Sequence, residues 1–376
     1  MYKTLIAGAG CDASGVLLEY LNNAGLSSEK EPDAEAAAAR ALFVDCVVTS
    51  ADSEGFDICQ KIKTAAEYIP VLLTAESGWA GLEELMAQSG ADDWVVSDNL
   101  LVASRIKALC RVKKMSDELK SRYKLLEDRT KRLDFQMAMA KRVQRSFIRE
   151  FDMTVGDVRF VSKYLPALEI GGDFFEIAEL DEDTVAVCIG DVSGHGISAA
   201  LLTVQLNCAI RAAKYYNPAQ FLYHMNNEMV KVFEGADIGM YACVFAAVIN
   251  TRRKRVYYAN AGQVLPIRYC GATGQISELM SIGTPIGLMP NESYDYRTLA
   301  YEPGDIILFY TDGMSDNAHK DDPGEFFARA EALLAGMANE PDPNVIAGAV
   351  VDEFCAYPDG RTRCTLDDVS LIVARF

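Results

Sequence analysis

The chain has 376 residues, of which 54 are acidic, 36 are basic and 50% are hydrophobic, giving a net charge of −18. This hydrophobic content excludes a largely disordered protein, and the length predicts two or three domains. The acidic charge disfavours nucleic acid or anionic lipid as the main partner, and no apolar run reaches the roughly 18 residues of a membrane span. Ten scattered cysteines without a CxxC pair predict reduced, buried thiols rather than a disulfide framework or a zinc site.

The first 110 residues alternate short apolar runs with helical patterns. This alternation predicts βα units on a parallel sheet. Because Met1–Gly10 is typical of a strand and lacks a secretion signal's basic region, we expect a cytoplasmic protein. The expected segments, in chain order, are Thr4–Ala7, a helix near Ser14–Ala24, Ala34–Leu42, Phe43–Thr49, a helix near Phe56–Ala66, Pro70–Thr74, Leu82–Gln88, Trp94–Val96 and Leu100–Val112.

A glycine pattern after the first expected strand leaves one alternative open. Gly8, Gly10 and Ala13 match the dinucleotide-binding pattern GxGxxG/A. A tight strand-to-helix turn explains the same residues. Glu29 and Glu31 lie near the distance expected of a ribose-binding carboxylate, but in a polar stretch rather than at a strand end. A dinucleotide-dependent enzyme is therefore the third hypothesis.

Five segments of this first part resemble a two-component receiver domain with flavodoxin-like topology: Lys3–Gly8, Asp45–Ser50, Gly55–Lys63, Ile69–Ala75 and Gly90–Val95. The working residues of that family are missing. Its phosphoacceptor Asp falls near Ser50 and its Lys at Ser97, the acidic pair is absent, and Thr74 alone matches. Without clustered carboxylates and this Asp, neither a Mg²⁺ site nor an aspartyl phosphate is expected, unless Asp52 is the acceptor. We therefore predict a pseudo-receiver, that is, a receiver-like domain that serves as a binding or dimerisation module and senses something other than phosphoryl transfer.

A basic segment separates two acidic ones. Residues 111–150 carry 13 basic and 6 acidic side chains, whereas the segments before and after have net charges of −10 and −15. The segment has no Gly or Pro, and a heptad seam predicts a long helix that packs on a partner as a parallel dimer. Arg122 and Arg129 weaken its second seam, so a single helix lying on its own domains is the alternative. The heptad positions are Val112, Leu119, Leu126, Leu133, Ala140 and Phe147.

The remaining residues predict a mixed α/β domain with substantial antiparallel sheet. The predicted organisation is domain 1–112, helical linker 113–150 and domain 151–376. In the last of these, Asp appears beside a strand end four times, at Asp173, Asp191, Asp312 and the pair Asp367 and Asp368. Each alone is typical of a turn or cap. If the strand ends converge, these carboxylates form a hard-oxygen site for Mg²⁺ or Mn²⁺, and two ions there would activate water and clamp phosphoryl oxygens.

Residues from about 135 to 376 resemble the SpoIIE/RsbU-type branch of the metal-dependent (PPM) serine/threonine protein phosphatases. The resemblance implies an αββα four-layer sandwich, with two central sheets flanked by helices and two Mn²⁺ or Mg²⁺ ions held between the sheets. The stretches that carry it are Ala140–Phe147, Gly171–Phe175, Asp191–Gly196, Tyr258–Gly262, Gly283–Leu288, Pro303–Asp305, Tyr310–Gly313 and Asp367–Leu371.

The resemblance also implies the roles of single residues. Its assignments are Asp191 as bridge between the ions, Asp173 and the Val192 carbonyl for one ion, and Asp312 and Asp367 for the other, with Asp368 replacing Asp367 if the alignment shifts by one. The chain departs from the family at Gln263, where a His is usual, and at Glu176, where an Asp is usual. His195 is either a general acid or a structural imidazole in a glycine-rich turn.

The leading hypothesis is a cytoplasmic, metal-dependent phosphoserine/phosphothreonine protein phosphatase, controlled by the pseudo-receiver through the linker. The resemblance implies direct hydrolysis without a phosphoenzyme, with Asp191 and Asp312 as catalytic residues. It also implies a small phosphorylated regulator as substrate, such as an anti-sigma-factor antagonist in a partner-switching pathway. A homodimer through the linker or the first domain is expected. The rival is a catalytically silent scaffold that sequesters a regulator, although four intact carboxylates, which repel one another without cations, count against it.

Overall fold

The computed structural model describes residues 1–8, 15–64, 67–75, 88–96, 99–167, 170–194, 196–233, 239–317, 323–355 and 367–376. The chain divides into two compact units, Met1–Arg132 and Leu133–Phe376. Over the described ranges, no helix is long and apolar enough to cross a membrane. Five of the eight cysteines in these ranges are buried and all eight are free thiols.

The N-terminal unit contains a five-stranded parallel sheet with the order β2-β1-β3-β4-β5. This order is typical of flavodoxin-like folds and fits the predicted βα units. The central strands are buried on both faces, as expected of a sheet covered by helices. Its elements are β1 (Lys3–Ala7), α1 (Val16–Asn23), β2 (Ser27–Glu31), α2 (Ala34–Arg40), a 3₁₀ turn (Ala41–Phe43), β3 (Cys46–Ser50), α3 (Ser53–Lys63), β4 (Val71–Ala75) and β5 (Asp93–Val96).

Strand β2 is an element that the sequence did not predict. Its five residues contain no apolar side chain, and it is an edge strand held by parallel pairing with β1. Glu31 lies 3.0 Å from the Arg40 guanidinium, which also pairs with Glu29. The carboxylates of Glu29 and Glu31 therefore form ion pairs with the Arg40 side chain of helix α2. Residues 9–14, which carry most of the dinucleotide pattern, lie outside the described residues, as do residues 82–87 and Ser97.

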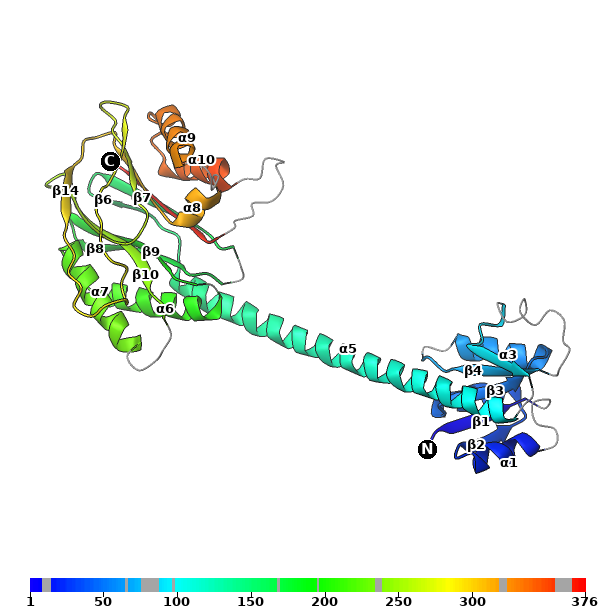
Figure 1. Cartoon of the computed structure of the whole chain (residues 1–376). Coiled ribbons are helices and arrows are strands. Elements are labelled where there is room, and N and C mark those ends of the chain that lie inside the picture. The colour runs from blue at the N-terminus through cyan, green and yellow to red at the C-terminus, as the bar shows by residue number, and fades with distance from the viewer. Residues whose placement is uncertain are drawn as a thin grey trace. The chain divides into compact units, whose positions relative to one another are not determined.

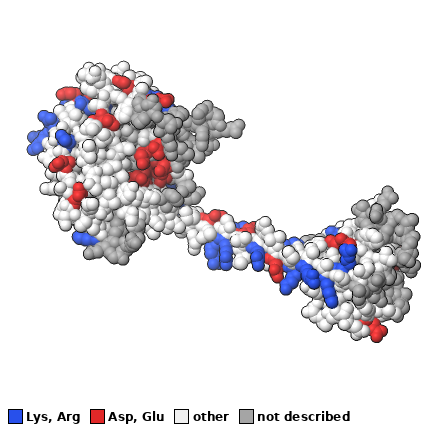
Figure 2. All heavy atoms as spheres, viewed as in Figure 1, with Lys and Arg blue, Asp and Glu red and all other residues white. Residues whose placement is uncertain are grey.

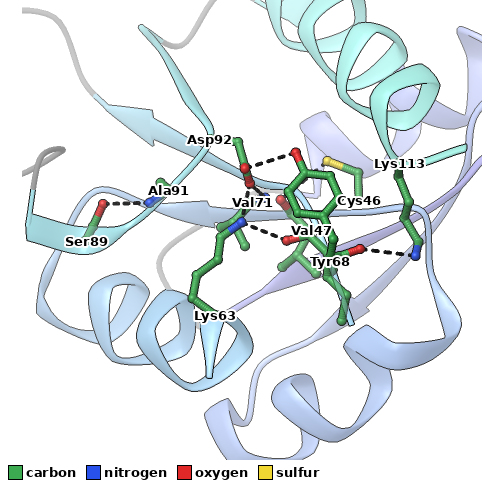
Figure 3. A network of polar contacts seen from close by, with 10 residues as sticks. Cys46, Val47, Lys63, Tyr68, Val71, Ser89, Ala91, Asp92 and Lys113 are labelled. Carbon is green, nitrogen blue, oxygen red and sulfur yellow. Dashed lines mark hydrogen bonds and ion pairs between the residues drawn. The ribbon is translucent and has the colours of Figure 1, made fainter. Parts of the chain in front are cut away.

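Asp92 is the centre of a polar network at the start of strands β4 and β5 (Figure 3). Its carboxylate accepts hydrogen bonds from the Val71 backbone N–H at 2.7 Å and the Tyr68 hydroxyl at 3.0 Å, and pairs with the Lys63 ammonium. Lys113, from helix α5 (Asn99–Phe147), donates to the Tyr68 carbonyl at 3.3 Å. The network thus ties helix α3, the segment before β4 and the start of the linker into one unit.

Helix α5 (Asn99–Phe147) runs without a break for 49 residues. The expected helix ending at Val112 and the expected linker helix are therefore one element. Its first turns are buried against the N-terminal unit through Val102, Ile106 and Cys110. Farther along, heptad positions Leu119, Leu126 and Leu133 are more than half exposed.

The C-terminal unit is built on two antiparallel sheets, which confirms the mixed α/β prediction. Their strand orders are β14-β11-β10-β9-β8 and β13-β12-β15-β16-β7-β6. The elements are β6 (Asp152–Val155), β7 (Val158–Leu165), β8 (Asp173–Asp181), β9 (Thr184–Val192), α6 (Ile197–Ala212), α7 (Pro218–Phe233), β10 (Ala242–Asn250), β11 (Arg255–Ala261), β12 (Ile267–Tyr269), β13 (Ile276–Glu278), β14 (Arg297–Ala300), β15 (Ile306–Tyr310), α8 (Asp312–Asn317), α9 (Pro323–Gly336), α10 (Pro343–Cys355) and β16 (Val369–Arg375).

The two sheets pack face to face around an aromatic and aliphatic core. Phe175 and Phe245 of one sheet share a cluster with Phe309 and Ile372 of the other, and the Phe245 and Phe309 ring centroids are 6.0 Å apart. Helices α6 and α7 cover the outer face of the first sheet, and α9 and α10 that of the second (Figure 1). Burying each such Phe contributes about 1.5–3 kcal/mol. This core fixes the sheets relative to each other, and with them the side chains at their ends.

Candidate metal centre

The acidic residues lie where strands of both sheets end. Asp173 is the first residue of β8 and stands opposite Asp191 in the ladder with β9. In the second sheet, β15 ends immediately before Thr311, and β16 begins immediately after Asp368. Because β15 and β16 are antiparallel neighbours, these two ends lie at the same edge. The topology therefore gathers the four predicted Asp positions at one edge of the sandwich.

A hydroxyl group connects the two sheets at this edge. Thr311 Oγ1 donates a hydrogen bond to Asp173 Oδ2 at 2.7 Å and accepts one from the Ser370 backbone N–H at 2.9 Å. Thr311 and Asp173 are both almost completely buried. A buried carboxylate requires such partners, because an unpaired charge in the protein interior is strongly unfavourable. Thr311 thus fixes one oxygen of Asp173 at the junction of the two sheets.

The neighbours Asp367 and Asp368 have different surroundings. Asp368 is 6% exposed, and its two oxygens accept hydrogen bonds from the backbone N–H groups of Ala167 at 2.8 Å and Gly172 at 2.6 Å. Asp367 is exposed, and one of its oxygens accepts from the Asp368 backbone N–H at 2.8 Å. Asp368 therefore supports the chain before β8, whereas the Asp367 side chain reaches toward solvent.

The carboxylates share one electrostatic environment. Burial, reinforced by the charge of Asp312, raises the pKa of Asp191 to about 8, and Asp367 and Asp368 act in the same direction. Burial also raises the pKa of Asp173, with Asp191 as the next cause. The pKa of Asp312 is raised by burial and then by Asp367. Carboxylates that penalise one another's charge are a donor set that a divalent cation would stabilise.

The acidic side chains at this edge are not arranged as a complete set of ligands around one ion. Over the described ranges, no group of three or more His, Cys, Asp or Glu side chains is placed so that it could hold one metal ion. Figure 2 shows a compact acidic patch on the visible face of the C-terminal unit. The chemistry of the donors fits hard cations, and the carboxylates interact without already enclosing an ion.

The other candidate residues divide between this edge and the interior. Val192 ends β9, and its backbone N–H donates to the Gly172 carbonyl at 3.1 Å. Glu176 is buried and pairs with Arg211 at 2.7 Å, so it forms a structural ion pair. Gln263 is also buried, and its side-chain Nε2 has no hydrogen-bond partner among the described residues. His195 lies outside the described residues.

Two polar residues at this site were not singled out from the sequence. Thr311 is a polar residue at the end of an apolar strand, which is the signal that could have identified it. Gln144 is 5% exposed near the end of helix α5 and bonds to Gly171. The sequence around Gln144 carries no corresponding signal, because helix α5 contains polar side chains along its whole length.

Comparison with known proteins gives one family match. The model of the stage II sporulation protein E (SpoIIE) family matches residues 181–376, slightly more than half of the chain. Protein IcfG of Synechocystis sp. is 28% identical over 234 residues, covering 55% of this chain and 36% of that protein. Phosphoserine phosphatase RsbP of Bacillus subtilis is 26% identical over 184 residues, covering 48% and 45%. The chain thus spans less than half the length of either relative.

A solved structure gives the same picture of the fold. The SiaA-PP2C domain of Pseudomonas aeruginosa superimposes with a TM-score of 0.53 at 22% sequence identity. The match covers 66% of this chain and 98% of that domain. At this level of identity the similarity concerns the fold alone, namely the two-sheet sandwich that places the acidic edge.

Proposed function

The chain belongs to the SpoIIE family, and from this membership we propose that it is a metal-dependent protein phosphatase that hydrolyses phosphoserine or phosphothreonine. The observation that carries the proposal is the buried acidic edge, where Asp173, Asp191 and Asp312 all have raised pKa values. The similarity to a relative named as a phosphoserine phosphatase supports the same substrate class. Four carboxylates held together have no role in a purely structural edge, because they destabilise the metal-free fold.

We propose that two Mn²⁺ or Mg²⁺ ions bind at this edge. The proposed ligands are Asp191 as bridge, Asp173 and the Val192 carbonyl for one ion, and Asp312 and Asp367 for the other. Asp368 is the less suitable choice, because backbone N–H groups already occupy both of its oxygens. When bound, such ions lower the pKa of a water molecule and neutralise phosphoryl charge.

The chain's own residues prepare this site in three ways. Thr311 orients the Asp173 carboxylate through a 2.7 Å hydrogen bond. Asp368 fixes the backbone at Gly172. A Cβ atom at Gly172 would lie 2.8 Å from Asp191 Oδ1, so glycine leaves the space that the Asp191 carboxylate needs. These features restrict the positions available to Asp173 and Asp191 in the metal-free chain.

The proposed substrate is a small phosphorylated regulatory protein of the anti-sigma-factor antagonist type, in a cytoplasmic partner-switching pathway. The N-terminal unit would act as a pseudo-receiver that controls the phosphatase through the linker. The proposed organisation is domain 1–112, linker 113–150 and phosphatase domain 151–376. The exposed heptad residues Leu119, Leu126 and Leu133 support a homodimer through α5, because a second copy would cover them.

The test is hydrolysis of p-nitrophenyl phosphate and of a phosphoserine peptide by the full chain, measured against Mn²⁺ concentration. We expect metal-dependent turnover that Asp312→Asn abolishes and that the exposed control Asp295→Asn retains. Calorimetry measures Mn²⁺ binding by the same proteins. A chain that neither binds Mn²⁺ nor hydrolyses a substrate fits the scaffold alternative and not the phosphatase. If the wild-type chain shows no turnover of either substrate, the phosphatase proposal fails and the scaffold that sequesters a regulator replaces it.

A further inference from the structure

Gln144 makes an unusual pair of contacts near the end of helix α5. Its side-chain Nε2 donates to the Gly171 carbonyl at 2.7 Å, and its Oε1 accepts from the Gly171 backbone N–H at 3.1 Å. The side chain is 5% exposed, on a helix whose preceding turns are largely exposed. One amide group thus satisfies both backbone groups of a single glycine.

Helix α6 fixes the orientation of this amide. The Gln144 Nε2 also donates to Thr203 Oγ1 at 3.0 Å, and that hydroxyl donates to the Ala200 carbonyl at 2.7 Å. Thr203 is fully buried. Both Nε2 hydrogens and the Oε1 atom of Gln144 therefore have partners. The opposite amide orientation would lose both bonds to Gly171, and it would keep the contact with Thr203 only if that hydroxyl gave up its bond to Ala200.

The backbone of Gly171 and Gly172 connects Gln144 to the acidic edge. Gln144 satisfies the two polar groups of Gly171, the Gly172 N–H donates to Asp368, and the Gly172 carbonyl accepts from Val192. All four backbone groups of the two buried glycines are paired, as buried backbone requires. Two of the four depend on the side chain of Gln144.

Gly171 and Gly172 pack closely against the carboxylates of Asp368 and Asp191. A Cβ atom on Gly171 would lie 2.1 Å from Asp368 Oδ2, and one on Gly172 would lie 2.8 Å from Asp191 Oδ1. Asp173 is the next residue of the chain. The segment therefore has no space for a side chain at either glycine, and its position depends on hydrogen bonds to Gln144 and Asp368.

We propose that Gln144 is a positioning residue for the metal centre: it holds Gly171 and Gly172 against Asp368 and so sets the place of Asp173. The link to catalysis rests on the proposed phosphatase function, whereas the link to the glycine segment does not. Without the amide, the Gly171 N–H and carbonyl lose their partners, and the segment relaxes away from Asp368. Residues that orient metal ligands typically change metal affinity about 10- to 100-fold when they are replaced.

The decisive variant is Gln144→Met in the full chain, because methionine matches the length and flexibility of glutamine without its hydrogen bonds. The matched control is Gln136→Met, since Gln136 is an exposed glutamine of the same helix. We expect calorimetry to show Mn²⁺ binding about 10- to 100-fold weaker in Gln144→Met and unchanged in the control. A dissociation constant within twofold of wild type would overturn the proposal.

Hydrogen exchange of the metal-free chain provides the second readout. We expect faster exchange in Gln144→Met at residues 171–173, with strands β9 and β10 as protected as in wild type. Exchange that accelerates equally across both strands would make Gln144 a general stability residue and contradict the positioning role. If wild type binds no Mn²⁺, the proposed function fails, and the exchange result still decides whether Gln144 holds the segment.

A second variant keeps the test decisive if Gln144→Met does not fold. Thr203→Val removes the hydroxyl that orients the amide and leaves the Gly171 backbone untouched. We expect a smaller loss of Mn²⁺ affinity, about 2- to 10-fold, with faster exchange at residues 171–173. Wild-type affinity and exchange in Thr203→Val, together with an unfolded Gln144→Met, would restrict Gln144 to folding and overturn the proposal.

Discussion

The Thr311 hydroxyl donates a 2.7 Å hydrogen bond to the Asp173 carboxylate, although 138 positions separate the two residues in the chain. Thr311 follows β15 in one sheet and Asp173 begins β8 in the other. The bond therefore joins the two layers of the sandwich at the edge where the acidic residues gather. Removing it would loosen a proposed metal ligand without changing any ligand.

Thr311→Val tests this relationship. The change keeps the shape of the side chain and removes both of its hydrogen bonds, so it leaves Asp173 and the Ser370 N–H without a partner. We expect the free energy of unfolding to fall by about 1–3 kcal/mol and Mn²⁺ binding to weaken about 10-fold or more. Urea unfolding and calorimetry measure the two effects, with the exposed strand residue Thr298 replaced by Val as control. Equal Mn²⁺ affinities in Thr311→Val and wild type would contradict the positioning of Asp173.

Asp191→Asn should separate stability from activity. Burial and neighbouring carboxylates disfavour the charge of Asp191, so a neutral side chain of the same size should stabilise the metal-free chain at pH 8 by about 1–3 kcal/mol. The same change removes the proposed bridging ligand, and phosphatase activity should be lost. Urea unfolding in chelator and a phosphoserine-peptide assay test both effects. A variant that is less stable and still active would reject this assignment of Asp191.

The stability of the metal-free chain should fall as the pH rises. The pKa of Asp191 is about 8 in the folded state, against an ordinary value of 3.8, so the folded state binds more protons than the unfolded state between these values. Stability is then greatest below about pH 4 for this group and decreases toward pH 8, by on the order of 1–4 kcal/mol. Urea midpoints at pH 5 and pH 8 with chelator measure the trend. Asp191→Asn should make the curve shallower without removing its slope, because the pKa values of Asp173 and Asp312 are also raised. A midpoint that rises with pH would refute the expectation.

Asp52 should act as a helix cap and not as a phosphoacceptor. Its carboxylate accepts from the Gly55 backbone N–H at 2.8 Å and the Ser50 hydroxyl at 2.7 Å at the start of α3. We expect Asp52→Ala to lower the free energy of unfolding by about 0.5–2 kcal/mol, more than Asp57→Ala at an exposed position of the same helix. Incubation with acetyl phosphate and Mg²⁺ should leave the mass of the wild-type chain unchanged. Addition of a phosphoryl group that Asp52→Ala abolishes would restore a working receiver.

Leu126→Glu should disrupt the proposed dimer. Leu126 is 57% exposed at a heptad position of α5, where a second copy would bury it. Sedimentation velocity should show a dimer for the wild-type chain and a monomer for Leu126→Glu. Ser121→Glu, an exposed change outside the seam, should remain dimeric. A wild-type chain that sediments as a monomer at every concentration would exclude dimerisation through this helix.

The sequence predicts those site residues that neighbouring residues in the chain mark, and it misses those that only distant partners in the fold mark. Asp173, Asp191 and Asp312 were identified because glycines and apolar strands flank them within a few residues. Asp367 was preferred to Asp368 only through the alignment with the family, since adjacent residues share every local signal. The tertiary hydrogen bonds are what show that Asp368 supports the Gly172 backbone.

Features that depend on distant partners were not predicted. Strand β2 has no apolar residue and exists because β1 pairs with it, so its pattern is that of a polar loop. Gln144 resembles any polar residue of a charged helix until Gly171 and Thr203, 27 and 59 positions away, are placed beside it. In both cases the deciding interaction is formed by the fold and not by the neighbouring sequence.

Under the proposed control by the first unit, a signal for the metal edge would have to pass along helix α5, which is continuous from Asn99 to Phe147. Between Val102, buried in the first unit, and Gln144, buried in the second, the helix contains no Gly or Pro at which a hinge could form. In the proposed dimer, a shift of one residue in the pairing of two such helices would turn each helix by about 100°. If the first unit controls the phosphatase as proposed, the part of α5 that contacts the metal edge is the turn carrying Gln144, through its two hydrogen bonds to Gly171.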